Sequence, residues 1–165
     1  MNNAEIKIRL IEESDIPEIA RVYADSFNRA ETGEHWAEDQ ALSFVQYWYN
    51  TQPDLFFVAV HGHKIIGGAM AEVKQWWNGV GLDHAQLFVD PEFFLNGVGK
   101  ALLTKLIKEG VDKYSIITFS GMASSHNAFP VSWYKKIAFA PMANWVQLGG
   151  KAKEILSKLE NGKNQ

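Results

Sequence analysis

VDPEFFLNGVGKALLTKLI, residues 89–107, changes character at its middle. It begins with the end of an apolar, strand-like run, which Asp90-Pro91 interrupts. Gly97 and Gly99 follow, and the apolar residues after them have the spacing that is typical of a helix. The stretch therefore predicts a strand, a glycine-containing loop and a helix in direct succession.

The backbone at the start of this helix suits an anion. The first N–H groups of a helix have no partner within the helix, and together with the helix dipole they favour phosphate. Glycines allow the backbone to approach such a ligand closely. The P-loop motif G-x-x-x-x-G-K-[ST] is absent, and Leu102 replaces the third glycine of the dinucleotide motif G-x-G-x-x-G. The alternative is that Gly97 and Gly99 only make a tight turn.

Periodicity predicts the elements on either side of this stretch. Strands are expected at residues 6–11, 55–60, 64–73, 81–89, 115–120, 139–142 and 145–148. Helices are expected at residues 16–27, 37–49, 98–113, 130–137 and 151–159. This order predicts an α/β (α+β) fold in which a mixed, mostly antiparallel central sheet of about six to seven strands is flanked by helices on both faces.

Length and composition limit the class of protein. A chain of 165 residues fits one domain, expected over residues 1–165 with a core at about 6–159. It has no cysteine, no secretory-signal pattern at its start and no apolar run of the ~18 residues that a membrane span needs. A cytoplasmic protein that does not act at a membrane is therefore expected. The net charge of -3 argues against nucleic acid as a partner.

A metal site is not expected. His61 and His63 are separated by one residue, but no third ligand accompanies them at the spacing of a metal site. They predict a polar turn between two strands.

Two blocks of the sequence resemble the GNAT family of N-acetyltransferases. Residues 89–93 and 97–103 resemble its motif A, whose loop pattern is Arg/Gln-x-x-Gly-x-Gly/Ala. Asn127 and residues 133–139 resemble a later segment, in which an Asn precedes a Tyr, here Tyr134, by seven residues. The predicted order of elements also matches the family's acyl-CoA N-acyltransferase fold over nearly the whole chain. The departures are Phe94 at the Arg/Gln position, Leu95 at a position that is often Gly, and Ala138 in place of the Gly before Phe139.

The resemblance implies acetyl-CoA as the co-substrate. In the family, main-chain groups of a splayed strand hold the pantetheine arm and the thioester carbonyl, which assigns this role to Leu87, Phe88 and Val89. Loop amides hold the pyrophosphate, which assigns that role to Leu95, Asn96, Gly97, Val98, Gly99 and Lys100. The family's coenzyme-contacting Asn corresponds to Asn127, although an Asn just before Phe129-Pro130 is equally suited to cap a helix.

Tyr134 is the candidate general acid. The resemblance matches it to the tyrosine that protonates the coenzyme sulfur, and a phenol with a pKa of about 10 can serve a thiolate leaving group. The alternative is an ordinary half-buried tyrosine on a helix face.

Asp83 is the candidate general base. It lies where histone-modifying relatives carry a catalytic glutamate, and strand alternation puts it on the same face as Ala85 and Leu87. His84 and Gln86 are then expected on the other face, where a lone His in a strand is more often structural. The alternatives for Asp83 are a turn-flanking position and a chain of water molecules as the base.

The acceptor is expected to bind beside an acidic segment that contains tryptophan. Glu34 and Trp36 would suit a cationic amine through charge and cation–π contact. The alternative is a solvated acidic loop with Trp36 packed on the core. Trp76 and Trp77 lie at the tip of a predicted hairpin, where exposed aromatic rings would cover either a ligand or the second subunit of a homodimer.

Together these features predict an N-acetyltransferase that moves an acetyl group from acetyl-CoA to a primary amine of a small molecule or peptide by direct attack. The alternative is a non-catalytic acyl-CoA-binding regulatory module, which Phe94 in the Arg/Gln position favours. Tyr134 and the intact Gly97-x-Gly99 favour the enzyme.

Overall fold

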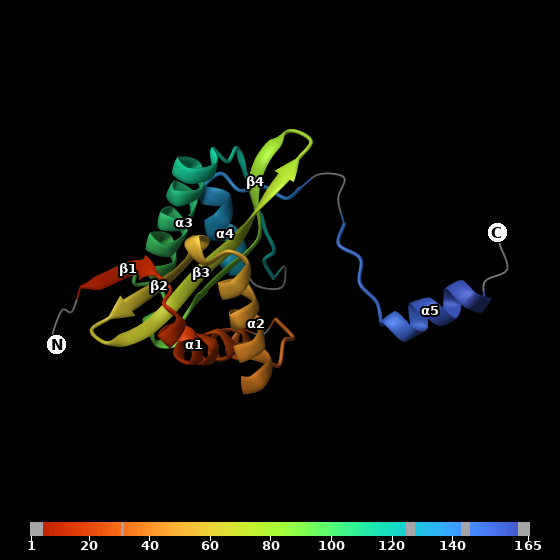
Figure 1. Cartoon of the computed structure of the whole chain (residues 1–165), viewed down its shortest axis with the longest axis horizontal. Coiled ribbons are helices and arrows are strands. Elements are labelled where there is room, and N and C mark those ends of the chain that lie inside the picture. Colours follow the sequence, from red (N-terminus) through yellow and green to blue (C-terminus); the bar gives the residue numbers. More distant parts are fainter. Residues whose placement is uncertain (1–4, 31, 125–127, 143–145, 162–165) are drawn as a thin grey trace. The chain divides into compact units, whose positions relative to one another are not determined.

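The computed structural model describes residues 5–30, 32–124, 128–142 and 146–161 (Figure 1). The chain divides into two compact units, Met1–His126 and Asn127–Gln165, and each is described by itself. The first unit carries the sheet and three α-helices, and the second carries two helices.

The elements follow the predicted order as far as the helix expected at residues 130–137. In the first unit they are β1 (Ile6–Leu10), η1 (Glu13–Asp15), α1 (Ile16–Arg29), α2 (Glu38–Thr51), η2 (Pro53–Leu55), β2 (Phe56–His61), β3 (Lys64–Trp76), β4 (Gly79–Val89), η3 (Pro91–Phe93), α3 (Val98–Tyr114) and β5 (Thr118–Gly121). In the second unit they are α4 (Ala128–Lys136) and α5 (Ala152–Asn161).

One mixed sheet of five strands has the order β1-β2-β3-β4-β5. The first four strands pair antiparallel with their neighbours, and β5 runs parallel to β4. This is the mixed, mostly antiparallel sheet that the sequence predicts. The chain reaches β5 through α3, because a parallel neighbour needs a crossover connection.

The prediction of about six to seven strands is wrong, because the sheet of the described residues has five. Residues 139–142 and 146–148 have no regular structure, and residues 143–145 of the second predicted strand lie outside the described part of the chain. A short apolar run becomes a strand only when a neighbour completes its hydrogen bonds, and Pro141 and Gly149-Gly150 further weaken these runs.

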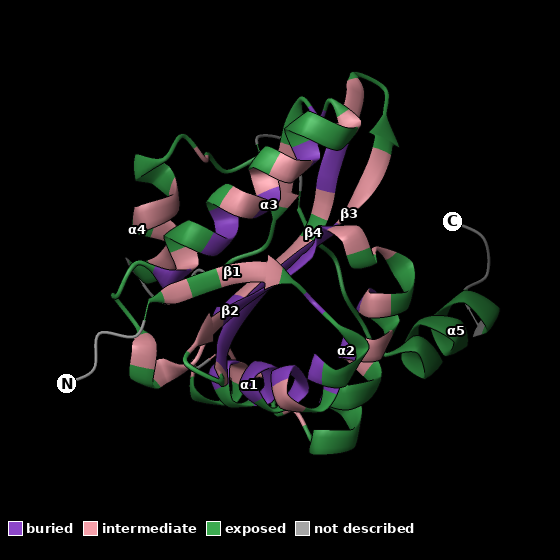
Figure 2. Ribbon diagram, turned by 60° about the vertical axis from the view of Figure 1, so that its left-hand side comes forward, coloured by how far each residue is buried: buried purple, intermediate pink, exposed green. Residues whose placement is uncertain are grey.

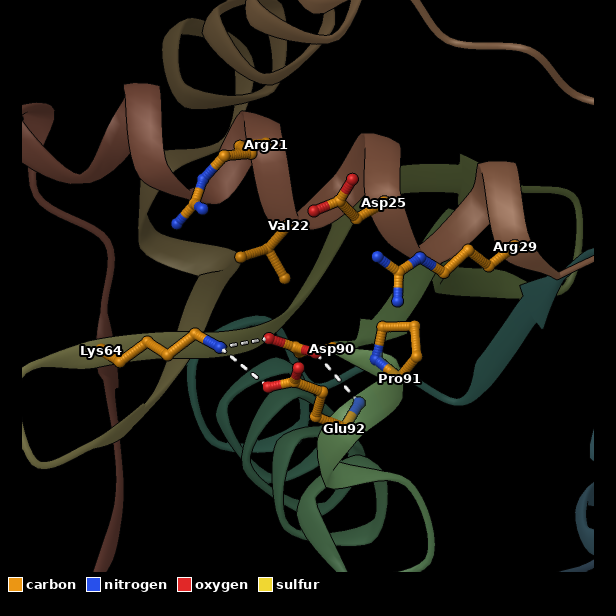
Figure 3. A pocket seen from close by; sticks show the side chains of 8 residues that line it. All are labelled: Arg21, Val22, Asp25, Arg29, Lys64, Asp90, Pro91 and Glu92. Carbon is orange, nitrogen blue, oxygen red and sulfur yellow. Dashed lines mark hydrogen bonds and ion pairs between the residues drawn. The ribbon is translucent and has the colours of Figure 1, made fainter.

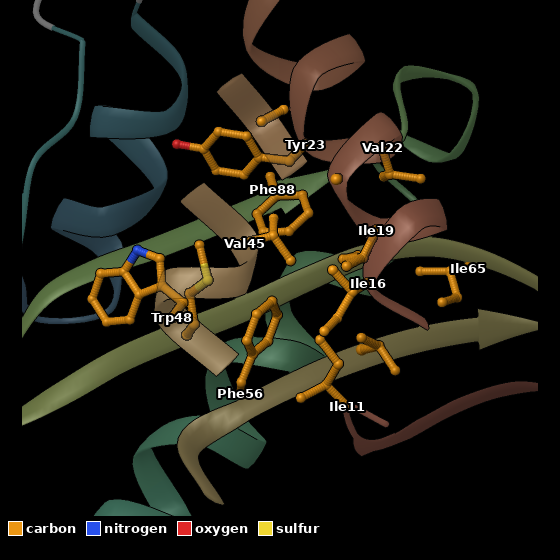
Figure 4. Close-up of a cluster of buried hydrophobic side chains, with 14 of the residues drawn as sticks. Ile11, Ile16, Ile19, Val22, Tyr23, Val45, Trp48, Phe56, Ile65 and Phe88 are labelled. Carbon is orange, nitrogen blue, oxygen red and sulfur yellow. The ribbon is translucent and has the colours of Figure 1, made fainter. Parts of the chain in front are cut away.

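Strand alternation divides the apolar side chains between the two faces of the sheet. Phe56 and Val58 of β2 pack in the cluster with α1 and α2, whereas Phe57 and Ala59 pack in the cluster with α3. Buried residues line the strands and the inward side of the helices (Figure 2). The cluster on the first face is shown in Figure 4, with Tyr23 beside Phe88. Helices therefore flank both faces, as predicted.

A β-bulge interrupts β4. Met70 of β3 is opposite Gln86 and Glu72 is opposite Asp83. Ala71 between them therefore lies opposite two residues of β4, where a regular ladder would have one. His84 lies at this bulge with a φ of 52°, in the left-handed region. The extra residue reverses the alternation, and the faces of β4 before and after it must be assigned separately.

Arg9 and Asp15 connect β1 to the start of α1. The guanidinium donates two hydrogen bonds to the carboxylate, at 2.6 Å from Nη1 and 2.9 Å from Nη2. The carboxylate also accepts the N–H of Glu12 at 2.7 Å. The hydrogen bond from Arg9 is the main reason that the pKa of Asp15 lies below its usual value.

We expect Asp15→Asn to lower the free energy of unfolding by about 1–2 kcal/mol near neutral pH. Because the pKa of Asp15 is lower in the folded state, its contribution is full above the unfolded carboxyl pKa of about 3.9 and disappears as the pH falls through the folded value. Urea unfolding between about pH 7 and pH 3 should therefore show the two proteins converging in acid.

Asp112→Asn is the control, because Asp112 makes an exposed helical ion pair with Lys108 that should contribute little. A difference between wild type and Asp15→Asn that persisted unchanged into acid would contradict the assignment.

Candidate functional site

The loop between β4 and α3 is fixed where it begins. The N–H of Asp90 donates to the carbonyl of Ile66 on β3 at 2.8 Å, and the Asp90 carboxylate accepts from Lys64 Nζ at 2.7 Å and from the N–H of Glu92 at 3.0 Å. Burial raises the pKa of this carboxyl, but the bonds from Lys64 and Glu92 lower it further, so that it lies below its usual value. The start of the loop is thereby held to β3.

The middle of the loop is exposed and has an unusual backbone. Leu95 has a φ of 64° and a side chain that is 90% exposed, and Gly97 has a φ of 79°. Gly97 is the N-cap of α3, and its carbonyl accepts the N–H of Ala101 at 3.0 Å. Val98 is buried and anchors the helix to the core. The N–H groups of the first turn of α3 therefore lie at an exposed loop, without partners within the helix.

The space around the two glycines admits a ligand. A Cβ at Gly97 would meet nothing within 4 Å, and a Cβ at Gly99 would make ordinary contacts with Val89 and Leu87, at 3.8 and 3.9 Å. Gly97 is required by its positive φ and not by crowding. Gly99 brings the first turn of α3 against the end of β4.

Among the residues that the structure describes, no strand pairs with the outer edge of β4 beyond Ala85. The parallel pairing of β4 with β5 ends at Ala85 and Gly121. The hydrogen bond from Asp90 to Ile66 shows which residues of β4 bond to β3, because every second residue does so in an antiparallel pair. Phe88 is one of them. The main-chain groups of Leu87 and Val89 therefore point away from β3.

One of these groups is already used, because the carbonyl of Val89 accepts a hydrogen bond from Ser26 Oγ of α1 at 2.8 Å. Ser26 is buried, and it was not among the predicted site residues. A serine among the apolar residues of a predicted helix was the feature of the sequence that could have indicated such a buried hydrogen bond. The predicted coenzyme residues of the first unit thus lie in one stretch, Leu87–Lys100, with Phe88 turned toward β3 and its ring in the core.

The prediction that Asp83 shares a face with Ala85 and Leu87 is wrong. Because of the bulge, Leu82 packs in the α3 cluster with Ala85 and Leu87, and Asp83 lies on the opposite face. The signal was present in the sequence: Leu82, Ala85, Leu87 and Val89 are spaced as a strand with one extra residue.

The Asp83 carboxylate is occupied by neighbouring groups. It accepts hydrogen bonds from Ser120 Oγ and from the N–H of His84, and Lys74 Nζ lies 3.5 Å away. Burial raises the pKa of Asp83, but these bonds and charges lower it further, to below its usual value. A carboxylate held in this way is a weak base.

The acceptor candidates of the α1–α2 connection contact each other. Trp36 Nε1 donates to Glu34 Oε2 at 2.6 Å, and the Trp36 ring packs edge-on against Tyr23 at 5.1 Å between centroids. Trp36 is therefore both packed on the core and bonded to the carboxylate. Burial, and then the charge of Glu34, raise the pKa of Tyr23. The Tyr23 hydroxyl donates to Gln86 Oε1 of β4 at 3.3 Å.

Trp76 and Trp77 lie at the tip of the β3–β4 hairpin, as predicted. Trp77 is 93% exposed, and Trp76 is 42% exposed with Lys74 Nζ 5.6 Å from its ring centroid.

Tyr134 lies on α4 of the second unit. Its ring packs against Trp133 and Phe139, with centroids 5.0 and 5.3 Å away. Burial raises the pKa of its phenol. Asn127 lies outside the described residues.

A separate pocket lies beside α1. Its walls include Arg21, Asp25 and Arg29 of α1, and Figure 3 shows Lys64 reaching Asp90 and Glu92 across its floor. None of the predicted site residues lines it. The ion pairs of Lys64 with Asp90 and Glu92 in this pocket anchor the loop between β4 and α3.

The described residues contain no cluster of three or more side chains of the types that hold a metal. Within the same part of the chain, no helix has both the length and the apolar character to cross a membrane.

The sequence profile of the Acetyltransferase (GNAT) family matches residues 16–139. A predicted acetyltransferase with acetyl-CoA from Clostridium acetobutylicum is 18% identical, with a TM-score of 0.71 over 96% of this chain and 100% of that one. PH1933 from Pyrococcus horikoshii OT3 is 25% identical, with a TM-score of 0.68 over 88% and 93% of the two chains. An aminoglycoside N-acetyltransferase, AAC(6')-Iy, in complex with CoA is 18% identical, with a TM-score of 0.69 over 92% and 98%. No curated protein matches the chain.

Proposed function

Because the chain belongs to the GNAT acetyltransferase family, we propose that it transfers an acetyl group from acetyl-CoA to a primary amine of a small molecule or peptide by direct attack. The observation that carries this proposal is the stretch Leu87–Lys100. A free strand edge leads directly into an exposed loop and a helix start with unpartnered N–H groups.

The residues of this stretch fit coenzyme A. The N–H groups of Val98, Gly99 and Lys100 would hold the pyrophosphate, and the open space at Gly97 leaves room for it. The main-chain groups of Leu87 and the N–H of Val89 would hold the pantetheine arm and the thioester carbonyl. When bound, acetyl-CoA would supply the acetyl group as an activated thioester.

Direct attack asks little of the protein. It must hold the amine beside the carbonyl, polarise the carbonyl and move two protons. Tyr134 would protonate the leaving thiolate, and its raised pKa keeps the phenol in the protonated, donating form near neutral pH.

The acceptor would lie on the α1–α2 face of β4. Glu34 and Trp36 would attract a cationic amine, and the exposed Trp76-Trp77 tip is a further candidate for contact with it. One structural neighbour is named an aminoglycoside N-acetyltransferase, and this name supports an amine as the acceptor.

A second candidate function is binding of acyl-CoA without turnover. The observation in its favour is Phe94, which is 48% exposed where the family pattern has an Arg or Gln. Release of free thiol from acetyl-CoA with a panel of primary amines separates the two functions. Binding without thiol release across the panel would favour the second.

We expect Gly97→Val to weaken acetyl-CoA binding by about tenfold or more, equivalent to about 1.4 kcal/mol, because a β-branched residue cannot keep the positive φ of the loop. Gly62→Val is the matched control, since Gly62 also has a positive φ and open space but lies in the β2–β3 turn. Calorimetry on both folded variants measures the effect. Equal affinities in the two variants would refute the role of the loop.

We expect Phe94→Arg to tighten acetyl-CoA binding by about fivefold, because one solvated Arg–phosphate contact is worth about 1 kcal/mol. Tyr47→Arg adds the same charge to an exposed position on α2 and should leave binding unchanged. Weaker binding in Phe94→Arg would mean that the Phe94 ring itself supports the loop.

We expect Tyr134→Phe to lower kcat by about a hundredfold with little change in KM for acetyl-CoA, because the lost proton transfer matters only as sulfur gains charge. Steady-state kinetics with the best acceptor of the panel measures it, and circular dichroism checks the fold. A variant that kept more than about half of the wild-type kcat would exclude Tyr134 as an essential acid.

A further inference from the structure

We propose that His84 is the general base of this acetyl transfer and that Glu72 positions it. The proposal rests on the proposed function and adds to it the residue that receives the proton of the acceptor amine. It is carried by a hydrogen-bonded pair at the bulge of β4, which neither the sequence pattern nor the family resemblance identifies.

The two side chains form a dyad across two neighbouring strands. His84 Nδ1 lies 2.6 Å from Glu72 Oε1, so that in neutral imidazole Nδ1–H donates to the carboxylate and Nε2 keeps its lone pair. The His84 side chain is 57% exposed, which leaves Nε2 accessible to a substrate. The Glu72 side chain is 24% exposed, which suits a residue that orients the ring through Nδ1 and does not itself contact the substrate.

The bulge explains why a strand residue can have this orientation. His84 has a φ of 52°, a conformation that costs free energy for a residue with a Cβ, and such strain is concentrated at functional sites. A regular strand would place the ring on the face opposite Asp83 and away from Glu72. The expected structural role of His84 therefore does not account for its geometry.

The dyad lies on the acceptor side of β4. Gln86 Nε2 donates to the carbonyl of His84 at 3.3 Å, and Gln86 Oε1 accepts the Tyr23 hydroxyl at 3.3 Å. Tyr23 in turn packs against Trp36, whose indole is bonded to Glu34. A row of contacts thus joins the dyad to the predicted amine-binding segment. The free edge at Leu87 begins three residues beyond His84.

The charged groups around the ring favour His84 over Asp83 as the base. Lys74 Nζ lies 3.5 Å from both Glu72 Oε1 and Asp83 Oδ2, and Asp83 also accepts from Ser120. Asp83 therefore has its acceptor capacity directed to fixed donors, whereas the hydrogen bond found for the His84 ring in the described part of the chain is at Nδ1, not at Nε2. Among those residues, Glu72, Lys74 and Asp83 are the charges that face the dyad.

The proton balance follows directly. Nε2 takes one proton from the acceptor ammonium, and the resulting imidazolium is stabilised by the Glu72 carboxylate. The amine nitrogen forms a bond to the thioester carbon, the C–S bond breaks, and the second amine proton replaces the one that the thiolate receives from the general acid. His84 then releases its proton to water. The sum is one amide, one thiol and one proton from one ammonium and one thioester.

Acetyl-CoA and the fastest amine of the panel test the proposal in the full chain. His84→Asn removes the base but tolerates a positive φ, and it should lower kcat by about a hundredfold with KM nearly unchanged. Glu72→Gln should lower kcat by about tenfold and leave KM unchanged. His63→Asn, in the exposed β2–β3 turn, is the control and should behave as wild type.

His84→Gly guards against a purely structural effect, since glycine relieves the strain at this φ. Added imidazole should restore its activity at least about fivefold, and should not affect Tyr134→Phe. If the wild type turns over and His84→Asn keeps more than half of the wild-type kcat, the dyad is refuted, whereas the proposed acetyltransferase activity is not. Absence of rescue in a folded His84→Gly would overturn the dyad as well. No turnover by wild type with any amine would overturn the proposed function, and the dyad with it.

Discussion

The extra residue in β4 is the constraint on which the candidate site depends. It lies where the antiparallel ladder with β3 shifts register, and the parallel pairing with β5 ends at the same place. Beyond it, β4 remains bonded to β3 but offers its other main-chain edge to a ligand. A regular strand would bond to both neighbours along its length, and Leu87 and Val89 would then have no main-chain group to offer. The same residue brings His84 onto the face of Glu72.

From β4 to α3, residues with an unusual backbone conformation are interspersed with buried residues that hold the chain in place. His84, Leu95 and Gly97 have positive φ values, which cost about 1 kcal/mol or more at His84 and at Leu95 because these residues have a Cβ. Phe88 and Val98 are buried between and beside them, and the bond from Lys64 to Asp90 fixes the start of the loop. The core therefore offsets the strain, and the loop is held in one conformation. Such preorganisation reduces the entropy that binding costs.

The sequence predicted what depends on local pattern, and it missed what depends on pairing. The hairpin strands, the glycine loop and α3 follow from periodicity and from turn residues, and their observed bounds are close to those expected. The two strands expected at 139–142 and 145–148 failed because apolar runs do not reveal whether a partner strand exists. Asp83 was assigned to the wrong face because strict alternation was assumed across a bulge that the spacing of Leu82 and Ala85 already indicated. The contact between His84 and Glu72 joins residues of different strands, which no local pattern reports.

In the proposed function, recognition by main-chain groups and recognition by side chains use different parts of the first unit. The stretch Leu87–Lys100 offers mostly N–H and C=O groups, which persist when side chains change, as they have at Phe94 and Leu95. The α1–α2 face of β4 instead offers the side chains of Glu34, Gln86 and His84, which substitution alters directly. Main-chain groups suit a coenzyme that is common to a family, and side chains suit acceptors that differ. Within β4, the bulge separates the residues that offer side chains from the residues that offer main-chain groups.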